Sequence, residues 1–178
     1  GTKENALNLA MALKAQKARQ AAAGGAKVVL TRDKEQELTR RERSVLAESN
    51  KGDLFIAIHC GASLAPSASG FEVFCCGVRA DAGQQIRAAA DEYAARSHEI
   101  GAAVAEALAT QTGSKNSGVR SMPCAVLSDV RMAGILIEVG CMTNSTEETL
   151  LRTEEYQDKI AQGIAAGIAK ILAGKGSP

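Results

Sequence analysis

Aromatic side chains are scarce in this sequence, which contains no tryptophan, two tyrosines and three phenylalanines. Stacking platforms for nucleic-acid bases or sugar rings are built from such rings, so their scarcity argues against those binding modes. The formal net charge of the 178 residues is only +1, which gives no reason to expect a nucleic-acid partner. No apolar run approaches the roughly 20 residues that a membrane-spanning helix needs. We therefore expect polar or metal-based substrate contacts, with no nucleic acid and no membrane span.

Cysteine pairs with the spacing of a metal site are also missing. The five cysteines are an odd number and include no C-x-x-C pair, which argues against a zinc finger. Cys75 and Cys76 are neighbours in a strand pattern, so their side chains should point to opposite faces. We expect the cysteines to be small buried hydrophobic residues. A disulfide stays an open alternative, and the sequence does not settle the redox compartment.

What the sequence does contain is an alternation of apolar strands and amphipathic helices. Its length fits a single domain with enough residues to bury a core. Ile160, Ile164 and Ile168 form a helical stripe, whereas residues 54–60 are a nearly continuous apolar run, typical of a strand covered on both faces. The predicted helices cover residues 4–23, 37–49, 79–112, 145–151 and 154–172, and the predicted strands cover residues 27–32, 54–60, 71–76, 124–128 and 134–138.

This alternation predicts an α/β fold, with a single mixed, mostly parallel twisted sheet and helices on both faces. No helix separates residues 54–60 from residues 71–76, so we expect the second of these strands to pair antiparallel at an edge of the sheet. Residues 112–123 contain glycine and serine and are expected to form a loop.

Polar side chains that can bind a metal or a proton lie where these elements begin or end. Glu138 and His59 each end an apolar strand, and Glu4 lies in the first turn of the first helix. Parallel strands bring their carboxyl ends to one edge, where the following helices begin, so the three should meet on one rim if a strand precedes Glu4. His and Glu are ordinary zinc ligands, and metal-assisted hydrolysis needs a further carboxylate as a base. His98 lies on the polar side of a helix and is expected to be solvated.

Each residue of this rim also has a simpler interpretation. Glu4 could be only a first-turn acid that the helix dipole favours. His59 could be a core histidine bonded to the backbone. Glu138 could pair with an arginine such as Arg32 or Arg43, because a buried carboxylate is costly without a partner.

Taken together, the sequence resembles the zinc-dependent N-acetylmuramoyl-L-alanine amidases of the amidase-3 type, which are bacterial cell-wall hydrolases. The likeness covers nearly the whole chain in the family's order. It is carried by the stretches Lys3–Leu9, Gly25–Arg32, Arg43 with Ala47 and Asp53–His59, and Ile137–Asn144 with Glu147, Glu148, Leu150, Leu151 and Ile160–Ile168.

The resemblance implies that Glu4 and His59 are ligands of one zinc ion and that Glu138 is the catalytic carboxylate. A zinc-bound water would attack the amide that joins the lactyl group of N-acetylmuramic acid to L-alanine. Glu138 would take the proton of this water and pass it to the leaving amine, while zinc polarises the carbonyl. The resemblance also implies peptidoglycan as the substrate, an activator protein as a candidate partner, and a periplasmic or extracellular (secreted) location.

Three departures from the family pattern affect these expectations. The family's first ligand is a His in a His-Gly-Gly turn after an opening strand, and this sequence lacks that segment. Two protein ligands are one short of the three that are usual for catalytic zinc. Residues 60–62 replace a segment that usually holds Asn, and Cys141 stands where a bulky aromatic is usual. We therefore expect residues 1–178 to be a single, N-terminally incomplete amidase domain that binds zinc weakly or not at all and is inactive in this form.

Other hypotheses remain beside the enzyme. A catalytically degenerate domain of the same fold could hold peptidoglycan or a partner without cutting. A zinc exopeptidase of related architecture is a third hypothesis, weakened by the lack of further Asp and His candidates for a second metal. Some amidases of this type cover their zinc with a long helical insertion. The corresponding segment, residues 78–112, is only moderately long, so we expect no self-blocking helix.

Overall fold

The computed structural model describes residues 3–22, 26–76 and 84–174, which form five helices and four strands. The helices are α1 (Glu4–Ala21), α2 (Arg40–Ser49), α3 (Gln84–Thr112), α4 (Ser145–Leu151) and α5 (Glu154–Gly174). The strands are β1 (Leu54–Gly61), β2 (Phe71–Cys76), β3 (Asn116–Met122) and β4 (Ala133–Cys141). Each predicted helix is confirmed within the described residues, with ends that differ by a few residues; residues 23 and 79–83 of these predictions lie outside the described residues. Among the described residues, no helix is long and apolar enough to cross a membrane.

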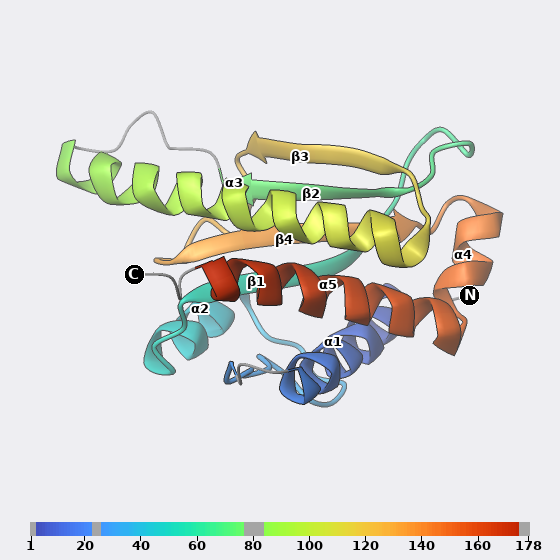
Figure 1. Cartoon of the computed structure of the whole chain (residues 1–178), viewed down its shortest axis with the longest axis horizontal. Coiled ribbons are helices and arrows are strands. Elements are labelled where there is room, and N and C mark those ends of the chain that lie inside the picture. The colour runs from blue at the N-terminus through green and yellow to red at the C-terminus, as the bar shows by residue number, and fades with distance from the viewer. Residues whose placement is uncertain (1–2, 23–25, 77–83, 175–178) are drawn as a thin grey trace.

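The strands form one mixed sheet in the order β1-β4-β2-β3 (Figure 1). β1 is parallel to β4, and β2 is parallel to β3. The pairing between β2 and β4 is antiparallel and joins the two parallel pairs. The prediction of a mixed, mostly parallel sheet is therefore confirmed.

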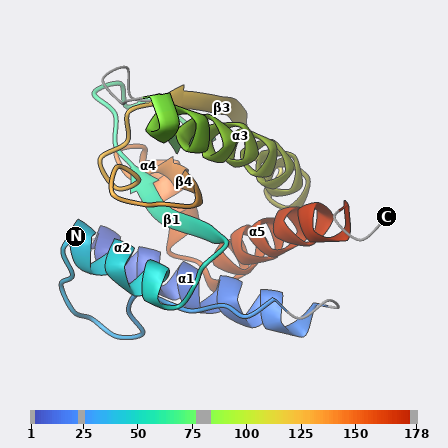
Figure 2. The same ribbon diagram turned by 90° about the vertical axis from the view of Figure 1, so that its left-hand side faces the viewer.

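Both faces of the sheet are covered. α3 and α5 lie side by side on one face, and α1 packs against α5 and β1 (Figures 1 and 2). The main core on this face includes Ile137 of β4 and Ile164 of α5. On the second face, Ala47 of α2 and Leu127 of the loop before β4 pack in a smaller cluster with Phe55 of β1.

Two of the predicted strands are wrong. Residues 27–32 belong to no strand, because an apolar run forms a strand only where another strand pairs with it, and none of the described strands does so. Residues 124–128 form turns, in which the amide of Leu127 donates to the carbonyl of Cys124 at 3.0 Å. Both side chains are buried on the second face of the sheet. This segment is apolar because it covers the sheet, not because it belongs to it.

β3 lies within the segment that the sequence predicts to be a loop. Most of its side chains are exposed, so the strand shows no alternation of apolar and polar residues. Because β3 pairs with β2, the position of β2 in the sheet also differs from the prediction. The predicted antiparallel pairing of β2 exists, but its partner is β4, and β2 lies between β4 and β3. The prediction that β2 is an edge strand is therefore wrong.

α3 does not lie over the strand end that carries Glu138. Ile137 belongs to the core beneath α3, and Leu136 belongs to the cluster on the opposite face. Successive side chains of a strand alternate between faces, so Glu138 lies on the face of Leu136. The prediction of no self-blocking helix is confirmed for α3, whereas residues 78–83 of that prediction lie outside the described residues.

The cysteines behave mainly as predicted. Four of them are free and buried, namely Cys60, Cys75, Cys124 and Cys141. The side chain of Cys76 lies outside the described residues. Burial, reinforced by the charges of Glu4 and Glu138, raises the pKa of Cys60 to about 12. A thiol with this pKa stays protonated near neutral pH, so Cys60 is not an activated nucleophile.

The close approach of α5 to α3 generates a stability prediction. A Cβ atom at Gly167 would lie 2.5 Å from Val104 Cα and 2.9 Å from the carbonyl oxygen of Ala103. Alanine gains about 1 kcal/mol in helix propensity over glycine, but overpacking of this kind costs roughly 1–3 kcal/mol. We expect Gly167→Ala to lower the free energy of unfolding, measured by chemical denaturation.

Gly174→Ala is the matched control in the same helix. A Cβ atom there meets nothing within 4 Å, so we expect unchanged or slightly higher stability. Equal stability of Gly167→Ala and the unsubstituted protein would show that the two helices do not pack as closely as described.

Candidate active site

His59 and Glu138 lie beside each other on neighbouring strands. They are register partners in the parallel pair of β1 and β4. Partners on adjacent strands are about 5 Å apart and direct their side chains to the same face. The prediction that these two strand ends meet is therefore confirmed.

Glu4 reaches this pair from the first turn of α1. Its Oε1 lies 2.9 Å from His59 Nδ1, and it accepts hydrogen bonds from Asn8 Nδ2 at 3.1 Å and from the amide of Cys60 at 3.4 Å. Burial by itself would raise the pKa of Glu4, but the hydrogen bonds from Asn8, His59 and Cys60 outweigh it and lower the pKa. Glu4 is therefore held in its ionised form against the imidazole.

Glu138 has the opposite electrostatic setting. Burial raises its pKa, His59 partly offsets this effect, and the charges of Glu4 and Glu72 raise the pKa further. Its Oε2 atom is buried and makes no hydrogen bond within the described part of the chain. Gly61 lies beside this atom, since a Cβ atom there would lie 3.4 Å from Glu138 Oε2, within van der Waals contact. Burial of a carboxylate with an unsatisfied oxygen costs folding free energy, and such residues are common at functional sites.

The simpler interpretations of Glu138 and His59 do not agree with the contacts that these residues make. Neither arginine suggested for Glu138 pairs with it: Arg32 donates to the carbonyl of Asn5 at 2.6 Å, and Arg43 donates to Thr31 Oγ1 at 3.1 Å. The imidazole of His59 contacts a carboxylate and is 41% exposed, unlike a core histidine bonded to the backbone.

The structure also bears on the simpler interpretations of Glu4 and His98. Glu4 does lie in the first turn of α1, but a helix-dipole role alone does not explain its contact with His59. His98 is exposed, as predicted.

The sequence interpretation missed a continuation of this polar row across the sheet. Glu72 of β2 is the register partner of Glu138, and its Oε1 accepts a hydrogen bond from Arg120 Nη1 of β3 at 3.0 Å. The row therefore runs from His59 through Glu138 and Glu72 to Arg120. Only knowledge of the strand order could have revealed it, because these residues come from separate parts of the sequence.

The turn after β4 holds the end of this strand in place. Asn144 caps α4 by accepting hydrogen bonds from the amides of Thr146 and Glu147. The carboxylate of Glu147 then accepts from the amide of Cys141 at 2.7 Å and from the amide of Gly70 at 2.6 Å. Glu147 thus ties the end of β4 to the start of β2, and its role here is structural.

The donor set is incomplete for a catalytic zinc ion. Glu4 and His59 offer an oxygen and a nitrogen of the right chemical type, but catalytic zinc usually has three protein ligands. Among the described residues, no three His, Cys, Asp or Glu side chains are grouped so that they could hold a metal ion. The residues present therefore do not by themselves fit the ion.

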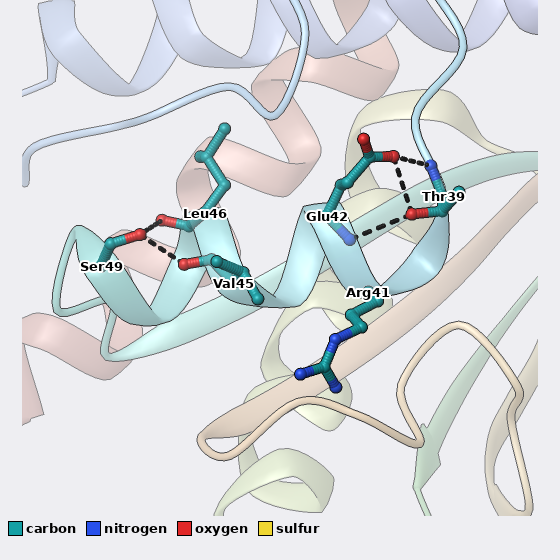
Figure 3. Close-up of a pocket in the computed structure, with 6 residues that line it drawn as sticks. All are labelled: Thr39, Arg41, Glu42, Val45, Leu46 and Ser49. Atoms are coloured by element: carbon teal, nitrogen blue, oxygen red, sulfur yellow. Dashed lines mark hydrogen bonds between the residues drawn. The ribbon is translucent and has the colours of Figure 1, made fainter.

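A depression of about 600 Å³ lies away from this rim, on α2 (Figure 3). It is lined by Thr39, Arg41, Glu42, Val45, Leu46 and Ser49. Thr39 and Glu42 form a capping box that satisfies the first turn of α2, so their polar groups are already occupied. None of the candidate site residues lines this depression.

The chain also matches a known protein family. Residues 1–170 match the family described as N-acetylmuramoyl-L-alanine amidase (Amidase_3). The chain belongs to this family. The resemblance predicted from the sequence stretches is thereby confirmed.

Individual proteins are also similar to this chain. YqiI, an uncharacterised protein of Bacillus subtilis (strain 168), is 31% identical over 144 residues, which are 81% of this chain and 63% of YqiI. The N-acetylmuramoyl-L-alanine amidase LytC of the same strain is 30% identical over 82% of this chain and 27% of LytC. The catalytic domain of the amidase CwlV from Bacillus (Paenibacillus) polymyxa var. colistinus has a TM-score of 0.78 and 30% identity, over 97% of this chain and 86% of that chain. This chain thus spans less than two thirds of the length of YqiI and of LytC.

The setting of Glu138 predicts a pH-dependent stability change. Because burial raises its pKa, ionised Glu138 opposes folding above the pKa that a glutamate has in the unfolded chain. We expect Glu138→Gln to raise the melting temperature of the metal-free protein at pH 7 by roughly 2–4 °C, which corresponds to about 1 kcal/mol. The gain should vanish as the pH falls below about 4, where the native glutamate is also neutral.

Glu155→Gln is the control for this comparison. Glu155 is exposed, and its hydrogen bond with Lys159 lowers its pKa, so its replacement should give no gain in melting temperature at pH 7. A lower melting temperature for Glu138→Gln at pH 7 would contradict the described setting of Glu138.

Proposed function

We propose that this chain is the catalytic part of a peptidoglycan hydrolase that cleaves the amide between N-acetylmuramic acid and L-alanine. The observation that carries the proposal is the meeting of Glu4, His59 and Glu138 on one rim, in a chain of the amidase family. The family match also favours this activity over that of a zinc exopeptidase.

Glu138 is the proposed general base. A catalytic base works best when its pKa lies near the working pH, and burial shifts the pKa of Glu138 in that direction. Its buried Oε2 has no hydrogen-bond partner among the described residues and can accept a proton from a water molecule. Glu138 then returns this proton to the leaving amine of L-alanine, so the carboxylate is regenerated.

Glu4 and His59 are the proposed protein ligands of a zinc ion. Together with a third ligand, these two residues would hold an ion that would supply Lewis-acid chemistry at the scissile carbonyl. The lowered pKa of Glu4 favours the ionised carboxylate that a metal requires, and this residue already lies against His59. A third ligand is needed beyond these two.

Metal analysis of the purified chain tests the consequence of this incomplete set of zinc ligands. We expect residues 1–178, purified alone, to retain well below one equivalent of zinc after dialysis and to leave peptidoglycan uncut. The measurement is metal analysis of the dialysed protein, with release of stem peptides from sacculi followed in parallel. One tightly held equivalent of zinc, together with amidase activity from the same chain, would contradict this expectation.

Substitution of Glu138 tests its proposed role as the general base. In the native full-length protein, we expect Glu138→Gln to lower the rate of stem-peptide release by roughly 10²-fold or more, because it removes the general base. Glu155→Gln, on the exposed side of α5, should leave the rate unchanged. Full activity of Glu138→Gln would show that another group takes the proton.

A degenerate, peptidoglycan-binding domain is the second candidate function. The incomplete zinc donor set favours it, since such a domain would need no complete metal site. The two functions are separated by whether the native protein cuts or only sediments with sacculi. The single-domain organisation, the activator protein and the periplasmic or extracellular location stay predictions.

A further inference from the structure

Arg120 lies at the far end of the polar row from His59, and the proposed function does not use it. We propose that Arg120 is a specificity-determining residue that binds a carboxylate of the peptide stem, close to the bond that is cut. This inference rests on the proposed function, because it takes Glu138 as the place where the amide lies.

The guanidinium of Arg120 is held in one place by two contacts. Its Nη1 donates to Glu72 Oε1 at 3.0 Å, and its Cζ lies 5.8 Å from the ring centroid of Phe74. Even so, the Arg120 side chain is 62% exposed, whereas that of Glu72 is 22% exposed. An arginine that is both positioned and open to solvent loses little conformational freedom when it binds a ligand.

Arg120 also keeps hydrogen-bonding capacity for a ligand. A guanidinium carries five N–H donors in a planar fork. Among the described residues, Glu72 is the only hydrogen-bond partner of this side chain. The fork matches the geometry of a carboxylate, which can accept two parallel hydrogen bonds from it.

The distance from Glu138 to Arg120 selects the part of the substrate that reaches the guanidinium. β4 and β3 are separated by β2, so the two strands are roughly 9–10 Å apart. Arg120 is the register partner of Phe74, two residues along β2 from Glu72, and its side chain leans back to reach the Glu72 carboxylate. An extended peptide advances about 3.3–3.6 Å per residue. A carboxylate within about two or three residues of the cleaved amide therefore reaches Arg120 if the stem crosses the strands. Because Glu138 and Glu72 would repel such a stem, Arg120 supplies the compensating positive charge.

A purely structural role for Arg120 is the competing interpretation. Exposed ion pairs contribute little to stability, so the pair with Glu72 is not explained by folding alone. Arg120 could instead only neutralise Glu72 beside Glu138. That role would change the pH profile of cleavage equally for all substrates, whereas a carboxylate subsite changes the affinity for acidic stems alone.

Binding of two matched stem peptides tests the inference. One peptide begins with L-alanine and D-glutamate, and the other carries the amidated residue D-isoglutamine in the second position. Isothermal titration of the native full-length protein should show the acidic peptide bound roughly 10- to 100-fold more tightly, the range expected for a charge-assisted hydrogen bond. Arg120→Gln should remove this preference by weakening the acidic peptide alone, and Arg120→Lys should keep part of it. Unchanged binding of the amidated peptide shows that the variants are folded.

The outcomes separate this inference from the proposed function. No preference in the unsubstituted protein, an equal loss for both peptides in Arg120→Gln, or no measurable binding of either peptide would overturn the inference. Cleavage of a muropeptide is measured separately. A protein that prefers the acidic peptide but never cuts a muropeptide would sink the proposed function and leave the inference standing.

Discussion

The register between β1 and β4 is the constraint on which the candidate site depends. It sets His59 beside Glu138, and the antiparallel pairing of β4 with β2 extends the same row to Glu72. A slip of one residue would move each of these side chains to the opposite face of the sheet. The register is fixed from the other face, where Ile135 and Ile137 are fully buried beneath α3 and α5. The apolar core therefore specifies the placement of the polar groups.

Neighbouring carboxylates on this rim have opposite pKa shifts because their surroundings differ. Glu4 accepts several hydrogen bonds, which lower its pKa, whereas Glu138 is buried with an unpaired oxygen and has a raised pKa. A metal ligand must be ionised and a general base must be able to hold a proton, so each setting suits the role that we propose. Separation of pKa values between adjacent titratable groups is a usual sign of such a division of roles.

The sequence predicts the elements whose signal is local. The helices, β1, β4 and the meeting of His59 with Glu138 follow from apolar periodicity and from the geometry of parallel strands. β3 carries no such pattern, because it is largely exposed. The pair of Glu72 and Arg120 depends on strand order, which local patterns do not encode. Conversely, the turn at residues 124–128 has the composition of a strand because it is buried against the sheet.

The central claim is that the rim of Glu4, His59 and Glu138 is the active site. Anomalous diffraction at the zinc edge from crystals of the native full-length protein tests it most directly. The account predicts one zinc ion held by Glu4 and His59, with Glu138 close by and not among its ligands. A fully occupied zinc ion elsewhere on the protein, with none between Glu4 and His59, would contradict it.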